Sequence, residues 1–128
     1  ETNIHILLQC ECRNPDIPAN MEMNVYRIVQ ESLTNIRKHA DAHIVRVLLQ
    51  CDDKGNYLIL IENDGKGFDK KAIQSEAGKH LGLTIMNERA RYLGGRLKID
   101  SEPDEGTRIE LRFKYIPEQN IGDNISHN

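Results

Sequence analysis

Apolar and polar residues alternate along four short segments of the chain, and a fifth segment is almost entirely apolar; these patterns predict five β-strands. The segment YLILIEN at 57–63 is almost continuously apolar, which favours a central, well-covered strand. The other four segments are residues 4–12, 44–51, 96–102 and 107–115. The turn-forming runs DDKGN and PDEG separate two pairs of these segments, so the sequence predicts two hairpins.

Two further segments repeat apolar residues every three or four positions, which predicts helices. The first is about twenty residues long, starts with Pro18 or Asn20 as its cap, and ends near the HADAH run at 39–43. The second covers residues 81–93 and is followed by two glycines, a common signal for a helix end. The core stripe of the first helix is expected to contain Val25, Ile28, Val29, Leu33, Ile36 and Ala40.

The resulting order is strand, helix, two strands, a long polar loop, helix and two strands. We therefore expect an α+β fold with two layers: a mixed, mostly antiparallel sheet and helices on one face. Residues 1–116 form one domain in this interpretation, and the polar tail at 117–128 is expected to be disordered. No dinucleotide-binding or P-loop motif and no internal repeat is present.

Composition and charge narrow the classes of partner. The 128 residues include 17 basic and 20 acidic side chains, which give a net charge of −3. Without a basic run, a nucleic-acid or anionic-membrane partner is disfavoured. No apolar run reaches the roughly 18 residues of a membrane span. The chain begins with Glu1 rather than Met, and we expect it to be a piece of a longer protein.

The three cysteines do not resemble a disulfide framework. The count is odd, no C-x-x-C motif is present, and Cys51 has no partner at metal-site spacing. We therefore expect reduced thiols of a cytosolic protein. A zinc site formed by Cys10, Cys12 and a histidine is the less favoured alternative.

A polar strip borders the apolar stripe of the first helix. It contains Glu31, Asn35 and Lys38, and His39 leans further toward the core. Glu31 and Asn35 are four residues apart, so their side chains lie one above the other. Such a strip is ordinarily a solvated helix flank, and it becomes a candidate site only when it is combined with other segments.

Three other segments supply groups that suit the base of a bound nucleotide. In ENDGKGF, Asp64 follows an apolar strand, where a carboxylate can accept a hydrogen bond from the exocyclic amine of adenine. Thr107 at the start of the last strand can brace that carboxylate or a bridging water. Gly65 and Gly67 allow the backbone to turn sharply and to approach a flat ring or a phosphate.

The remaining candidates suit the phosphates. The Asn35 side-chain oxygen can bind Mg²⁺, which usually also bridges phosphates. Lys38 supplies a positive charge, and His39 offers a planar ring to the base. In HLGL, the backbone N–H groups around Gly82 and Leu83 favour an anion at a helix start. Each motif alone is weak, but their joint order predicts an ATP site with Mg²⁺.

The segments ESLTNIRKHA, ENDGKGF and HLGLTIMNERARYLGGRLKIDSEPDEGTRIELRF resemble the N, G1 and G2 boxes of the GHKL superfamily, which includes gyrase, Hsp90, histidine kinases and MutL. The resemblance covers about residues 19–115 and implies the Bergerat ATP-binding fold. Within the superfamily, the chain is similar to the catalytic domains of sensor histidine kinases with nitrate-responsive regulators. The H-x-G-L pattern is similar to the nitrate/nitrite sensors.

This resemblance implies a role for each candidate. Asn35 would be the Mg²⁺ ligand, Asp64 the adenine selector, Lys38 a phosphate contact and His39 a residue that packs on adenine. Thr107 would support Asp64. Residues 68–81 would form a short ATP lid, in which His80 stands where many relatives have glycine. Glu31 occupies the position of the general base in the superfamily's ATPases, and in a kinase the same carboxylate could instead position Mg²⁺ or a water.

The implied reaction is transfer of the γ-phosphoryl group of ATP to a histidine. None of the five histidines lies in a phosphoacceptor-like helix, so the acceptor is expected on a separate dimerising helical domain of the same parent protein. The chain would then bind Mg-ATP but not autophosphorylate alone. The resemblance also implies a context for the chain. The segment itself would be monomeric, and its parent would be a dimeric inner-membrane protein with this domain in the cytoplasm. The partner would be a response regulator of the NarL type. A catalytically degenerate nucleotide-binding module and a free-standing ATPase remain alternatives.

Overall fold

The structure is a computed structural model that describes residues 3–13, 16–67 and 82–117. Its elements follow the predicted order: β1 (His5–Glu11), α1 (Ala19–Asn35), η1 (Ile36–Ala40), β2 (Ile44–Cys51), β3 (Asn56–Asn63), α4 (Leu83–Tyr92), β4 (Arg96–Ser101) and β5 (Thr107–Lys114). The five strands form one sheet in the order β1-β2-β3-β5-β4. Among the described strands only β1 and β2 pair in parallel, and β3 is central, as its apolar sequence predicted.

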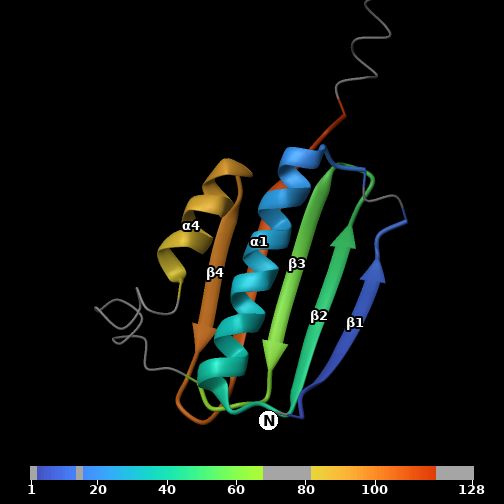
Figure 1. The fold of residues 1–128 in the computed structure, drawn as a ribbon. Helices are drawn as coiled ribbons and strands as arrows, with labels where there is room; N and C mark the ends of the chain where they lie inside the picture. The colour runs from blue at the N-terminus through green and yellow to red at the C-terminus, as the bar shows by residue number, and fades with distance from the viewer. Residues whose placement is uncertain (1–2, 14–15, 68–81, 118–128) are drawn as a thin grey trace, which may run out of the picture.

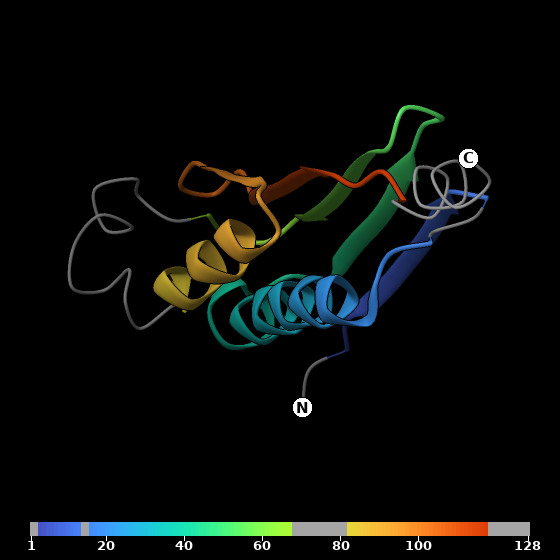
Figure 2. The same cartoon turned by 90° about the horizontal axis from the view of Figure 1, so that it is seen from above.

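The helices α1 and α4 lie on one face of the sheet, so the described residues form two layers (Figures 1 and 2). The core between the layers contains Ile28 from α1, Met86 from α4, and Ile61 and Leu111 from the sheet, all with at most 1% of their surface exposed. Alternating side chains of β3 and β5 face the helices, because successive residues of a strand point to opposite faces. The expected α+β fold is therefore confirmed.

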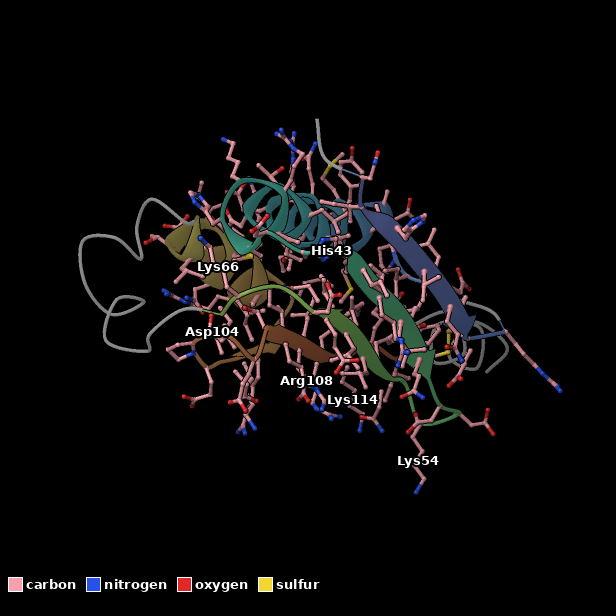
Figure 3. The ribbon with its side chains drawn as sticks, turned by 90° about the horizontal axis from the view of Figure 1, so that it is seen from below. His43, Lys54, Lys66, Asp104, Arg108 and Lys114 are labelled. Carbon is pink, nitrogen blue, oxygen red and sulfur yellow. A yellow bond between two sulfur atoms is a disulfide. The ribbon has the colours of Figure 1, made fainter. Side chains whose placement is uncertain are left out.

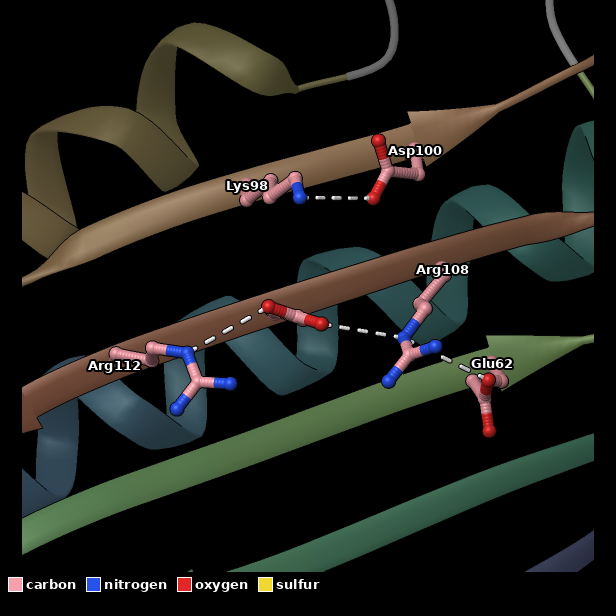
Figure 4. A network of polar contacts seen from close by, with 6 residues as sticks. Glu62, Lys98, Asp100, Arg108 and Arg112 are labelled. Carbon is pink, nitrogen blue, oxygen red and sulfur yellow. Dashed lines mark ion pairs between the residues drawn. The ribbon is translucent and has the colours of Figure 1, made fainter.

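None of the described helices covers the opposite face of the sheet, which carries charged side chains on β3, β4 and β5. Arg108 Nε lies 3.3 Å from Glu110 and 3.8 Å from Glu62, and Arg112 Nε lies 3.6 Å from Glu110 (Figure 4). On β4, Lys98 pairs with Asp100 at 3.6 Å. These side chains alternate with the apolar ones that face the helices, which is the pattern of a sheet with one solvated face.

The long helix contains two buried polar residues in addition to its apolar stripe. Ser32 is fully buried, and its hydroxyl donates a hydrogen bond to the Ile28 carbonyl at 2.7 Å and contacts Met86 Sδ at 3.3 Å. Asn35 is 7% exposed.

The helix ends in the π-helical segment η1, followed by Asp41 in a left-handed conformation with φ of 53°. The expected end near residues 39–43 is thus confirmed.

The cysteines differ from the expectation of reduced thiols, because Cys12 and Cys51 form a disulfide. The parallel pairing of β1 with β2 explains the bond. Glu11 is opposite Gln50 in the register. The residues that follow them, Cys12 and Cys51, therefore lie side by side. Cys10 is the exposed, free thiol. Local spacing in the sequence does not reveal this pairing, since the two residues are 39 positions apart.

Two sequence-based expectations lie outside the described residues: the disordered tail, beyond residue 117, and the ATP lid at 68–81 with His80. Among the helices that the structure describes, none is long and apolar enough to cross a membrane.

Candidate functional site

Residues 64–67, which follow β3 and are called the glycine loop here, pack against the end of the long helix. The Lys66 N–H donates a hydrogen bond to the Ala40 carbonyl at 2.7 Å. A Cβ atom added to Gly65 would collide with that same carbonyl, and one added to Gly67 would collide with the Glu102 carbonyl in the β4–β5 turn. These two glycines therefore permit a close approach of three backbone segments, whereas the sequence-based prediction concerned their approach to a ring or a phosphate.

The same helix also contacts the start of α4. Gly82 has a left-handed conformation with φ of 72°, and a Cβ atom there would collide with the carboxylate of Glu31. Glu31 is partly buried, one residue before the buried Ser32 that contacts Met86 of α4. Glu31 and Gly82 are therefore brought together, although they are 51 positions apart in the sequence.

Replacing Gly82 by alanine is expected to lower the free energy of unfolding by about 1–2 kcal/mol, because a side chain is disfavoured at this φ. It should also displace the Glu31 carboxylate and so weaken ATP binding. Urea denaturation and ATP titration measure the two effects.

Gly94→Ala is the matched control, because Gly94 has a similar φ of 66° but a Cβ there meets nothing within 4 Å. Equal ATP affinity in the two variants would show that the contact between Glu31 and Gly82 does not matter for the site.

The polar candidates of the long helix lie near its C-terminal end, the end that packs against the glycine loop. Asn35 is buried at the junction of α1 and η1, whereas Lys38 and His39 are exposed on η1. In a π-helix each N–H reaches back five residues, and such turns are frequent at functional sites. Figure 3, the view from below, shows Lys66 of the glycine loop beside the helices, and His43 between the helix end and β2.

Asp64 occupies a different environment from the one expected. Its side chain is exposed, and Oδ1 accepts hydrogen bonds from the backbone N–H groups of His43 at 2.8 Å and Ile44 at 2.9 Å. These two bonds lower the pKa of the Asp64 carboxyl below its usual value, and the bond from Ile44 has the larger effect. The carboxylate thus holds the start of β2 and is not directed along the helix-facing side of β3.

Asn63, the residue before Asp64, does lie on the helix-facing side of the sheet. Tyr57, Ile59 and Ile61 of β3 are buried there, and alternation places Asn63 on the same face. Its Oδ1 accepts a hydrogen bond from the Gly65 N–H at 2.9 Å, and its Nδ2 is buried without a hydrogen-bond partner. Our sequence-based candidates did not include Asn63, although counting the alternation from Ile61 would have found it.

On the β5 side, the cross-strand neighbours of Asn63 are also polar, whereas its neighbour on β2 is the buried Val45. Thr107 is opposite Asn63, and Ser101 is opposite Thr107, so the three form one cross-strand row. Both hydroxyl residues are buried, with their oxygens 3.0 Å apart, and the Ser101 hydroxyl donates to the Gly106 carbonyl at 3.3 Å. Thr107 is therefore placed beside Asn63, and its hydroxyl contact is with Ser101.

The candidate residues can hold a magnesium ion only together with a ligand that brings its own oxygens. Within residues 3–13, 16–67 and 82–117, no group of three His, Cys, Asp or Glu side chains is arranged around a metal position. Asn35 supplies one neutral oxygen, which fits Mg²⁺ because this ion keeps waters and binds phosphates. The zinc site considered for Cys10 and Cys12 is not formed, since Cys12 is in the disulfide.

Comparison with known proteins gives consistent results. The family described as "Histidine kinase-, DNA gyrase B-, and HSP90-like ATPase" matches residues 20–117. The Sensor protein VraS of Staphylococcus aureus is 35% identical over 116 residues, which are 88% of this chain and 31% of that protein. The signal transduction histidine-protein kinase/phosphatase DegS of Brevibacillus brevis is 36% identical over 80% of this chain and 25% of its own length. The chain thus spans less than a third of these relatives.

Two solved structures have the same fold. The blue-light activated histidine kinase of Erythrobacter litoralis EL346 gives a TM-score of 0.76 over 94% of this chain and 38% of its own, with 20% identity. Full-length ShkA in complex with AMPPNP gives 0.70 over 86% of this chain and 25% of its own, with 21% identity.

Proposed function

Because the chain belongs to the family of histidine kinase-, DNA gyrase B- and HSP90-like ATPases, as a catalytic ATPase domain of the histidine kinase type, we propose that it binds Mg-ATP and phosphorylates a histidine of its parent protein. The acceptor would lie on a separate dimerising helical domain. The longer relatives support this proposal, since each is named as a sensor or histidine kinase and contains much more than this domain.

One observation carries the proposal: a single helix contacts both segments that a nucleotide would have to touch. Its end at Ala40 packs against the glycine loop after β3, and its carboxylate at Glu31 packs against Gly82 at the start of α4. Asn35 lies between these two contacts along the helix and is buried. A nucleotide bound along this line would have its base near the sheet and its phosphates near α4.

The side chains suit distinct parts of ATP. Asn35 would hold Mg²⁺, and Lys38 on η1 would supply charge to the phosphates. The N–H groups at the start of α4, from Gly82 and Leu83, would favour a phosphate, and the ring of His39 would pack on the base. When bound, Mg²⁺ neutralises charge on the phosphates. In this role the protein mainly positions the reactants.

Glu31 has the position of a carboxylate that could either orient a water or support the metal ion. Its contact with Gly82 keeps it at the phosphate end of the proposed site. In a kinase, an ordered carboxylate there would help to position Mg²⁺ or its water rather than activate water for hydrolysis.

We further propose the context of a nitrate- or nitrite-type sensor with a response regulator of the NarL type. The support is the H-x-G-L pattern at residues 80–83 and the MNERARYLGG segment that follows. The parent would be a dimeric inner-membrane protein with this domain, itself monomeric, in the cytoplasm.

Mixing the chain with γ-labelled ATP and Mg²⁺ tests the proposal. We expect ATP binding that is stronger with Mg²⁺ than without it, and no acid-labile phosphohistidine on this chain. The histidines of the described residues support the second expectation, because His5 is in a strand and His39 and His43 lie at the helix end.

Other outcomes would support the alternatives. Steady ATP hydrolysis that Glu31→Ala abolishes would indicate a free-standing ATPase. Binding that is indifferent to Mg²⁺ would indicate a module without transfer activity, and phosphohistidine on the isolated chain would contradict the separate acceptor.

A further inference from the structure

The amide nitrogen of Asn63 is an exception in the interior of this domain. It is the one buried side-chain nitrogen or oxygen atom among the described residues that has no hydrogen-bond partner. Most buried polar atoms in proteins are paired, and an unpaired one costs stability, so each exception calls for a physical reason. A donor kept in this state at a binding site is explained if a ligand completes its hydrogen bonding.

The orientation of this amide is fixed by its surroundings. The Asn63 side chain accepts a hydrogen bond from the Gly65 N–H at 2.9 Å, and only the oxygen of an amide can accept. The NH₂ group must therefore occupy the other position. A flip of the amide would lose the Gly65 hydrogen bond, so the site presents a donor and not an acceptor.

The location of the amide connects it to the proposed nucleotide site. Asn63 is the last residue of β3, on the face covered by the helices, and the glycine loop begins directly after it. Its cross-strand neighbour Thr107 is buried, with its hydroxyl engaged by Ser101. The charged neighbour Asp64 is exposed and is held by two backbone N–H groups of residues 43 and 44.

We propose that Asn63 is the base-reading residue of this domain and that it donates a hydrogen bond from Nδ2 to a ring nitrogen or carbonyl oxygen of the base. This inference rests on the proposed function, because it names how that site would select its nucleotide. It replaces the earlier assignment of base selection to Asp64.

An amide donor selects differently from a carboxylate. A carboxylate can only accept, so it binds the exocyclic amine of adenine and repels the carbonyl oxygen that guanine has in the corresponding place. The NH₂ group of Asn63 can donate to ring N1 or N7 of adenine and equally to O6 or N7 of guanine. The site should therefore discriminate between ATP and GTP less than the same site with a carboxylate would.

Calorimetric titration of the 128-residue chain with ATP and GTP, both with Mg²⁺, tests the inference. In Asn63→Asp, the carboxylate keeps an acceptor for the Gly65 N–H, and the preference for ATP over GTP should rise roughly 5- to 150-fold relative to the wild type. In Asp64→Asn, which is nearly the same size as the original residue, the preference should stay as in the wild type.

Asn24→Asp is a charge-matched control, because it adds the same carboxylate near the other end of α1, beside Arg89. Its nucleotide preference should also match the wild type. If Asn63→Asp leaves the preference unchanged, or if Asp64→Asn shifts it, the inference is overturned while the proposed function stands. If the wild type binds neither nucleotide in the presence of Mg²⁺, the proposed function fails and the inference with it.

Discussion

Replacing Asn35 by alanine is expected to lower the affinity for ATP in the presence of Mg²⁺ roughly 10- to 150-fold, the usual range for loss of a polar contact to a charged group. The same substitution should have little effect on ATP binding in the presence of a chelator, because the contact that we propose for Asn35 is with the metal ion. Isothermal titration with and without Mg²⁺ separates the two effects.

Two checks accompany this variant. Asn35 is buried, so circular dichroism and the urea midpoint must show that the variant is folded. Asn35→Asp retains an oxygen ligand and should keep most of the metal dependence. If Asn35→Ala binds Mg-ATP as tightly as the wild type, Asn35 is not the magnesium ligand.

Removing the disulfide between Cys12 and Cys51 is expected to lower the free energy of unfolding by about 2–4 kcal/mol. The bond closes a loop across 39 positions of the sequence, and that loop contains all of α1 and η1. Opening it gives the unfolded chain more conformations. Urea denaturation in the presence and absence of a thiol reductant measures the change, and the double variant with serine at both positions should behave like the reduced protein.

Cys10→Ser is the internal control, since Cys10 is free and exposed and should contribute little to stability. ATP affinity should also be insensitive to reduction, because the disulfide lies at the end of β2 whereas the proposed site lies at its start, beyond η1. Three titratable thiols in the native protein without reductant, together with unchanged stability on reduction, would contradict the bond.

Sequence patterns were sufficient for the fold because each element has a clear period and clear boundaries. The nearly continuous apolar run at residues 57–63 identified the central strand, and the apolar repeat from Val25 to Ala40 identified the long helix. The patterns did not reveal Ser32, which is a polar residue in the core, because it is satisfied by a hydrogen bond to its own helix. They also did not reveal the disulfide, because it depends on the register of two parallel strands.

The candidate site was predicted less completely, for a local geometric reason. The sequence indicated segments that lie together in the structure, which brings Glu31 to Gly82 and the glycine loop to the helix end. The choice between the two adjacent polar residues at the end of β3 was made on side-chain chemistry, whereas the strand alternation counted from Ile61 favours Asn63 on the helix-facing side. A carboxylate is chemically the more obvious partner for adenine, but Asp64 is already beyond the strand. Its hydrogen bonds to β2 are visible only in three dimensions.

The π-helical segment from Ile36 to Ala40 makes this part of the domain tolerant of a change in chain length. Each of its turns accommodates one more residue than a regular α-turn, so deleting a single residue here could restore an ordinary helix without moving Ser32 on one side or β2 on the other. Such a deletion would rotate the positive charge of Lys38 around the helix axis. If Lys38 contacts phosphate as we propose, natural variation by one residue at this point would adjust that contact while the fold stays the same.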